Sequence, residues 1–92
     1  MSQPLKNVDI SALETEVLEL SQAMYSHLHS QVEDGKIKTK LHDQLIWLNH
    51  QIRYFSDSQD VEQLLENVNW VISNFNHDLS LPNKQLFRLI DK

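Results

Sequence analysis

The amino-acid sequence predicts an all-α fold, an antiparallel up-and-down four-helix bundle with a short C-terminal helix, in a single helical-bundle domain over residues 1–92. Hydrophobic residues make up 40% of the chain and recur three and four residues apart, which is the spacing of one helix face. The chain has one glycine and two prolines, whereas turn-rich β folds need many more. The breaks between the hydrophobic stripes are short, and short connections make neighbouring helices run antiparallel.

The first helix is expected from about Asp9 to Glu33. Its hydrophobic stripe consists of Ile10, Leu13, Val17, Leu20, Met24, Leu28 and Val32. Asp34 and Gly35 end this helix, and Gly35 suits the left-handed position that follows the last turn of many helices.

The second helix is expected from about Lys36 to Phe55. Its stripe consists of Ile37, Leu41, Leu45, Leu48, Ile52 and Phe55. The polar run of residues 56–58 breaks it, and either Asp57 or Ser58 can cap the helix that follows.

The third helix is expected from about Gln59 to Asn76, and a fourth from about Pro82 to the C-terminus, because proline is tolerated in a first helical turn. In the fourth helix Leu86, Leu89 and Ile90 are expected to face inward. The predicted core of the bundle consists of Leu13, Val17, Leu20, Met24, Leu41, Leu45, Leu48, Ile52, Leu64, Val68, Val71, Ile72, Phe75, Leu86 and Ile90.

The residue types predict no catalytic site, no metal site and no cofactor. Cysteine is absent, and a single glycine cannot form a glycine-rich phosphate loop. The five histidines include no pair at i and i+4, the spacing that places two zinc ligands on one helix face; His29 with Glu33 is the best such pair. The carboxylates lie off the hydrophobic stripes, where water solvates them. The chain is therefore not expected to be an enzyme.

Charge and hydropathy narrow the class of partner. The net charge of −5 argues against nucleic acid, whose binding draws most of its affinity from a basic surface. No run of 18 apolar residues occurs, so no transmembrane segment is expected, and the N-terminus does not resemble a signal peptide. A cytoplasmic protein that binds another protein is the resulting expectation.

Trp70 is the first candidate for partner binding. At about 100° per residue it falls opposite the stripe of the third helix, among Gln63, Glu66, Asn67 and Asn74. An exposed tryptophan is a favoured interface anchor, whereas the alternative is that the fourth helix or the N-terminal arm covers it. Trp47 and Tyr54, seven residues apart on the second helix, form an aromatic strip interpreted as cover for a neighbouring helix.

The second candidate is a basic ridge formed by Lys84, Arg88 and Lys92, which stand at i, i+4 and i+8 of the expected fourth helix. Such a ridge can meet an acidic partner or the anionic headgroups of a membrane. The alternative is that basic side chains suit the negative end of the helix dipole.

The C-terminal half resembles the immunity proteins of pediocin-like bacteriocins, the enterocin A immunity family. The resemblance is carried by the Val61-Glu62-Gln63-Leu64-Leu65 helix running to Phe75, by the link Leu79-Ser80-Leu81-Pro82, and by Gln85 and Leu89-Ile90. It implies a bacteriocin immunity protein that protects its producer by binding the cytoplasmic side of the mannose permease once bacteriocin has engaged that membrane protein. It would also give Trp70 and the basic ridge a role at the inner membrane face.

Two alternatives stay open. One is a small regulatory adaptor or antitoxin-like protein that binds a soluble protein partner through a helix face. The other is a homodimer in which Trp70 lies in the interface between two copies of the chain.

Overall fold

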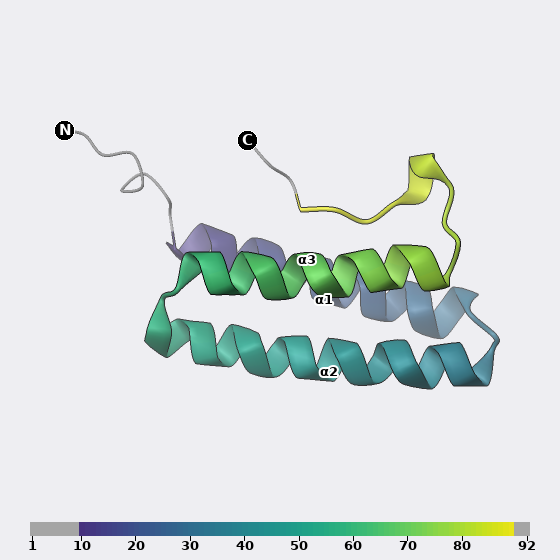
Figure 1. Ribbon diagram of the computed structural model, residues 1–92, viewed down its shortest axis with the longest axis horizontal. Coiled ribbons are helices and arrows are strands. Elements are labelled where there is room, and N and C mark those ends of the chain that lie inside the picture. Colours follow the sequence, from purple (N-terminus) through teal and green to yellow (C-terminus); the bar gives the residue numbers. More distant parts are fainter. Residues whose placement is uncertain (1–9, 90–92) are drawn as a thin grey trace.

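A computed structural model describes residues 10–89 (Figure 1). The described chain forms three α-helices, α1 (Ile10–Gln31), α2 (Gly35–Ser58) and α3 (Val61–Asp78), followed by a short 3₁₀ helix, η2 (Asn83–Gln85). The helices run up, down and up beside one another (Figure 1), and no strand occurs within residues 10–89. The all-α, up-and-down prediction is confirmed, but the four-helix bundle is wrong for this part of the chain.

The connection between α1 and α2, the first turn of the chain, differs from the prediction because Asp34 caps α2. Its Oδ1 accepts hydrogen bonds from the backbone N–H groups of Lys36 at 3.0 Å and Ile37 at 3.2 Å. An aspartate in this position satisfies N–H groups that the helix itself leaves unpaired. Gly35 is therefore the first residue of α2 and has no positive φ, so the expectation of a left-handed glycine after α1 is wrong.

The second turn comes later than predicted, because α2 continues through the polar run to Ser58. Gln59 then adopts the left-handed conformation with φ of 53°, and its N–H donates to the carbonyl of Phe55 at 2.7 Å. Asp60, rather than Asp57 or Ser58, caps α3 by accepting from the N–H of Gln63 at 3.1 Å. Serine and aspartate are tolerated in a last helical turn, so their presence alone did not end the helix.

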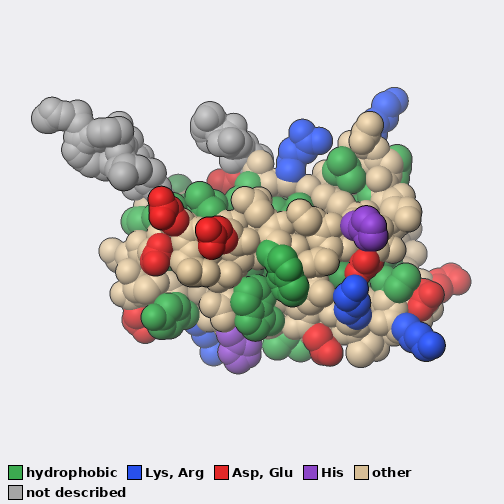
Figure 2. Space-filling view, viewed as in Figure 1, with side chains coloured by type: hydrophobic (Ala, Val, Ile, Leu, Met, Phe, Trp, Pro, Cys, Tyr) green, Lys and Arg blue, Asp and Glu red, His purple; other side chains and the backbone are tan. Residues whose placement is uncertain are grey.

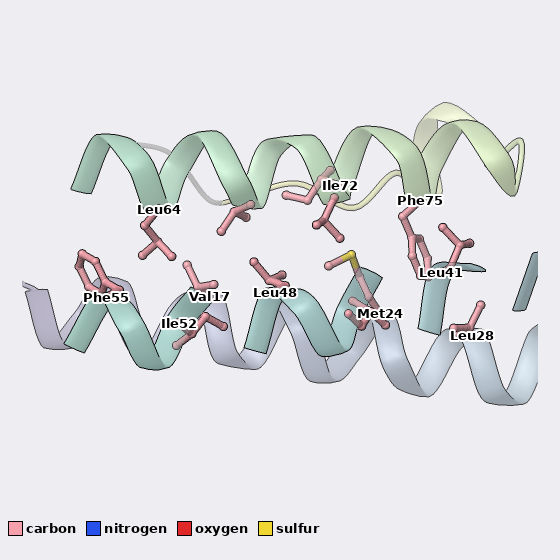
Figure 3. Close-up of a cluster of buried hydrophobic side chains, with 13 residues drawn as sticks. Val17, Met24, Leu28, Leu41, Leu48, Ile52, Phe55, Leu64, Ile72 and Phe75 are labelled. Carbon is pink, nitrogen blue, oxygen red and sulfur yellow. The ribbon is translucent and has the colours of Figure 1, made fainter. Parts of the chain in front are cut away.

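The core lies between the three helices, and its side chains point toward one another from all three (Figure 3). Its buried hydrophobic residues are Val17, Met24, Leu28, Leu41, Leu45, Leu48, Ile52, Phe55, Leu64, Val68, Val71, Ile72 and Phe75. The predicted core residues Leu13 and Leu20 are half-buried and pack against its edge. Leu28 and Phe55, which belong to the predicted stripes, are fully buried.

The chain after α3 does not form the expected fourth helix. It makes the η2 turn and then an extended segment, in which Leu86 has φ of −65° and ψ of 136°. Phe87 and Leu89 pack against the core, whereas Arg88 between them is exposed. This alternation is the pattern of an extended chain and not of a helix. Leu86, predicted to be core, is half-buried, and Ile90 lies outside the described residues.

Asn76 provides the physical reason for the extended conformation. Its Oδ1 accepts from the N–H of Phe87 at 3.0 Å, and its Nδ2 donates to the carbonyl of Phe87 at 2.9 Å. The Phe87 ring packs edge-on against Phe75, with ring centroids 5.3 Å apart, and near His27 at 5.5 Å. The Asn76 amide thus pairs the N–H and the carbonyl of Phe87, which a helix would pair internally. A fourth helix would have only about ten residues, and an isolated helix of that length is only marginally stable.

Candidate protein-binding surface

Trp70 lies on the polar side of α3, as its phase predicted, and this side is exposed. Its side chain is 51% exposed. Neither the described segment after α3 (residues 79–89, the tail segment) nor another described helix buries it. Its ring packs edge-to-face against the ring of Trp47 on α2, with centroids 5.6 Å apart and an interplanar angle of 72°. Trp47 is itself 38% exposed, so the interpretation that it only covers a neighbouring helix is incomplete. These are the two tryptophans of the chain.

The two rings stand in an open groove of about 700 Å³ between α2 and α3. Figure 2 shows hydrophobic side chains at the middle of this face, with acidic side chains on either side and some basic and histidine side chains among them. We call this surface the tryptophan face and define it by its lining residues, Asp43, Gln44, Trp47, Glu66, Asn67 and Trp70.

Each of the two helices contributes one carboxylate and one tryptophan to the tryptophan face. Asp43 stands four residues before Trp47 on α2, and Glu66 stands four residues before Trp70 on α3. Residues four apart lie on one helix face, so each carboxylate is adjacent to its tryptophan. Because α2 and α3 are antiparallel (Figure 1), the two carboxylates lie at opposite ends of the tryptophan pair.

A series of side-chain amides holds the α2–α3 seam beside the tryptophans. Gln63 donates to Asn67 at 3.2 Å, and Asn67 donates across the seam to Gln51 at 3.4 Å. Asn74 donates to the carbonyl of Trp70 at 2.9 Å. Gln44 has a buried Oε1 with no hydrogen-bond partner at the wall of the groove. The face therefore combines two indole rings, flanking carboxylates and amides suited to hydrogen bonding.

The predicted basic ridge is not a helix face in the described chain. Lys84 lies in η2 and Arg88 in the extended segment, and both are exposed, whereas Lys92 lies outside the described residues. Without a fourth helix, spacing of four residues no longer aligns these side chains. The tail packs on α1 and α3 through His27, Phe75 and Asn76, and none of its described residues, 79–89, lines the tryptophan face.

Two histidines meet across α1 and α2, a pairing that helical spacing alone did not predict. His29 Nε2 and His42 Nδ1 are 3.2 Å apart, and the ring of Tyr25 packs near both. Both histidines lie near the first turn, so an antiparallel register about that turn could have predicted their proximity. No group of three or more His, Cys, Asp or Glu able to hold a metal occurs in residues 10–89, and the absence of a functional metal stays a prediction.

An ion pair joins the start of α2 to the end of α3. Lys40 Nζ lies 2.8 Å from Asp78 Oδ2, and His77 Nδ1 lies 3.4 Å from the other carboxylate oxygen. The hydrogen bond from Lys40 is the main cause that lowers the pKa of Asp78 below its ordinary value of 3.8, against an opposing effect of burial. Lys40 is thereby engaged by α3, one turn before Asp43 on α2.

Comparisons of the chain with models of protein families, with curated proteins and with solved structures found no match. Within the described residues, no helix is long and apolar enough to cross a membrane.

Proposed function

We propose that this protein acts by binding another protein through the tryptophan face. The observation that carries the proposal is the packed pair of exposed tryptophans, Trp47 and Trp70, in an open groove between two helices. Tryptophan is enriched among the few residues that dominate interface energies, because it buries a large area and has few torsions to fix. Aromatic side chains gathered on a solvent-exposed groove are a feature of interaction sites.

Binding is favoured over catalysis by the chemistry of this face. Its lining residues are two indoles, two amides and two carboxylates. Asp43 and Glu66 are both exposed to water, whereas general acid–base catalysis uses a carboxyl whose pKa a sheltered pocket raises. We accordingly propose that the protein is not an enzyme and needs no cofactor.

The more specific proposal is bacteriocin immunity. Its support is the resemblance of the C-terminal half to the immunity proteins of pediocin-like bacteriocins, with the leucines of the Leu79-Ser80-Leu81-Pro82 link packed against the core after α3. The η2 turn and the extended segment after it depart from the final helix that the resemblance implied. Under this proposal the protein works in the cytoplasm, at the inner membrane face, on the bacteriocin-engaged mannose permease.

A protection assay tests both the use of the tryptophan face for binding and the more specific proposal of bacteriocin immunity. A bacteriocin-sensitive strain would produce the wild-type protein, the Trp70→Ala variant, or the Leu18→Ala variant as a control. Leu18 is an exposed hydrophobic residue on α1 outside the tryptophan face. We expect protection by the wild type and the control, and its loss with Trp70→Ala at an equal protein level. No protection by the wild type against any pediocin-like bacteriocin would refute immunity.

The alternative is a regulatory adaptor or antitoxin-like protein with a soluble partner. One observation favours it: the tryptophan face is flanked by carboxylates, which anionic lipid headgroups repel, while the exposed Lys84 and Arg88 lie on the tail segment. Purification of the wild type and Trp70→Ala from the native cell, followed by identification of bound proteins, separates the two. A soluble protein lost specifically with Trp70→Ala would favour the adaptor.

A homodimer through Trp70 is tested by light scattering over a range of concentrations. Dimerisation of the wild type that Trp70→Ala abolishes would identify a second copy as the occupant of the tryptophan face.

A further inference from the structure

We propose that the segment that occupies the tryptophan face is a cationic amphipathic helix with two basic side chains about two turns apart. This inference rests on the proposed function, since it names the chemistry of the partner that the face binds. It follows from the charge of the groove, from the spacing of its carboxylates and from its shape.

The charge of the groove selects a cation. Asp43 and Glu66 are acidic, and among residues 10–89 no basic side chain lines the groove. Lys40, the cation nearest to Asp43 along α2, is already paired with Asp78. Indole rings also attract ammonium and guanidinium groups through their negative faces. The net charge of −5 adds a longer-range attraction that speeds encounter with a positively charged partner.

The spacing of the carboxylates sets the spacing of the basic side chains. Each carboxylate precedes its tryptophan by four residues, which is about 6 Å along a helix axis. The rings of Trp47 and Trp70 are in contact and the helices are antiparallel, so the two helical rises add and place positions 43 and 66 on the order of 12 Å apart along the groove. On a partner helix, side chains separated by about 12 Å stand seven or eight residues apart on the same face.

The shape of the groove suits a helix. A seam between two antiparallel helices receives a third helix through anchor side chains that repeat along one face. Lysine and arginine can lay their aliphatic stems along the indoles while their charged ends reach the carboxylates. The tail segment packs on the other side of α3, where Phe87 contacts Phe75 and His27. The tail segment therefore covers that side of α3 and leaves the tryptophan face open for a partner.

Intrinsic fluorescence is a direct probe, because both tryptophans of the chain belong to the tryptophan face. The ligand is a designed amphipathic helix of roughly 20 residues, long enough to be helical alone, with two lysines seven residues apart on its leucine-rich face. One matched peptide has glutamate in place of both lysines, and another has the same lysines three residues apart. We expect saturable binding of the first peptide, about tenfold weaker binding of the other two, and loss of affinity between about 50 and 300 mM salt.

Two double variants with the same change of net charge isolate the carboxylates. Asp43→Asn with Glu66→Gln should weaken binding of the lysine peptide about tenfold. Glu19→Gln with Glu33→Gln removes two exposed carboxylates outside the lining and should leave binding unchanged. Circular dichroism would establish that both variants fold. Equal binding of the lysine and glutamate peptides, or equal affinity of the two variants, overturns the inference.

The protection and purification assays with Trp70→Ala distinguish failure of this inference from failure of the proposed function. Dependence of the natural activity on Trp70, without a preference for lysine peptides, would leave protein binding in place and refute the cationic helix. A preference for lysine peptides, without dependence of the natural activity on Trp70, would instead refute the proposed use of this face.

Discussion

Replacement of Asn76 by alanine should measure how firmly the tail segment is held on the bundle. The Asn76 amide makes two hydrogen bonds with the backbone of Phe87, at 2.9 and 3.0 Å, in a part-buried setting. A hydrogen bond contributes about 0.5–1.5 kcal/mol net to stability. We therefore predict that Asn76→Ala lowers the free energy of unfolding by about 1–3 kcal/mol. Asn76→Asp keeps the acceptor but sets a second carboxylate oxygen against the Phe87 carbonyl, so at pH 7 its loss should be at least as large.

Urea denaturation followed by far-ultraviolet circular dichroism gives the free energy of unfolding of each variant. Asn74→Ala is the matched control, because the Asn74 amide donates only within its own helix, to the carbonyl of Trp70. Its effect should be below about 1 kcal/mol. If Asn76→Ala were no more destabilising than Asn74→Ala, the pairing with Phe87 would not hold the tail, and Asn76 would not be the reason that the tail is extended instead of helical.

Three further predictions concern the bundle itself. Leu48→Ala should destabilise the protein by about 2–5 kcal/mol in urea denaturation, because Leu48 is fully buried, and an effect below about 1 kcal/mol would contradict its place in the core. Gly35→Ala should raise stability by about 0.4–1 kcal/mol, because Gly35 is helical and has open space around its Cα; a loss of stability would instead indicate a left-handed glycine. Asp78→Asn should cost up to about 1 kcal/mol at pH 7, since Lys40 is largely exposed. Because the folded-state pKa of Asp78 is lowered, this difference should disappear as the pH falls through that pKa, and a difference that persists in acid would contradict the ion pair.

The three helices were predictable because their signal is local and repeated. Residues such as Leu41, Leu45 and Leu48 recur at helical spacing, and the same residues are buried. The turns were harder, because a single residue type fits more than one position. Gly35 suits both the end of one helix and the start of the next, and the neighbouring Asp34 decides between them by capping α2.

The tail segment could not be predicted from helical spacing alone. Its conformation depends on Asn76, eleven residues before Phe87, and on the ring of Phe75, neither of which belongs to the segment itself. The leucines at 86 and 89 fit a helical stripe, yet Phe87 and Leu89 fit an extended chain equally well, and the structure adopts the second pattern.

The candidate site was predictable in part. The phase of α3 placed Trp70 on the polar side of the helix, and the structure shows that this side is exposed. The contact between Trp70 and Trp47 depends on the register of α2 against α3, which the sequence of neither helix specifies alone. The spacing of four residues from Asp43 to Trp47, and from Glu66 to Trp70, is visible in the sequence. Only the register of α2 against α3 shows that the two pairs lie on one face.

Calorimetric titration of the lysine peptide into the wild-type protein and into Trp70→Ala tests the central claim that the tryptophan face is a binding surface. Unlike fluorescence, the heat of binding does not depend on the residue that is removed. Truncation of an anchor tryptophan at an interface costs about 2 kcal/mol or more, so we predict at least about 30-fold weaker binding by Trp70→Ala. Equal affinity of a folded Trp70→Ala variant would contradict the claim.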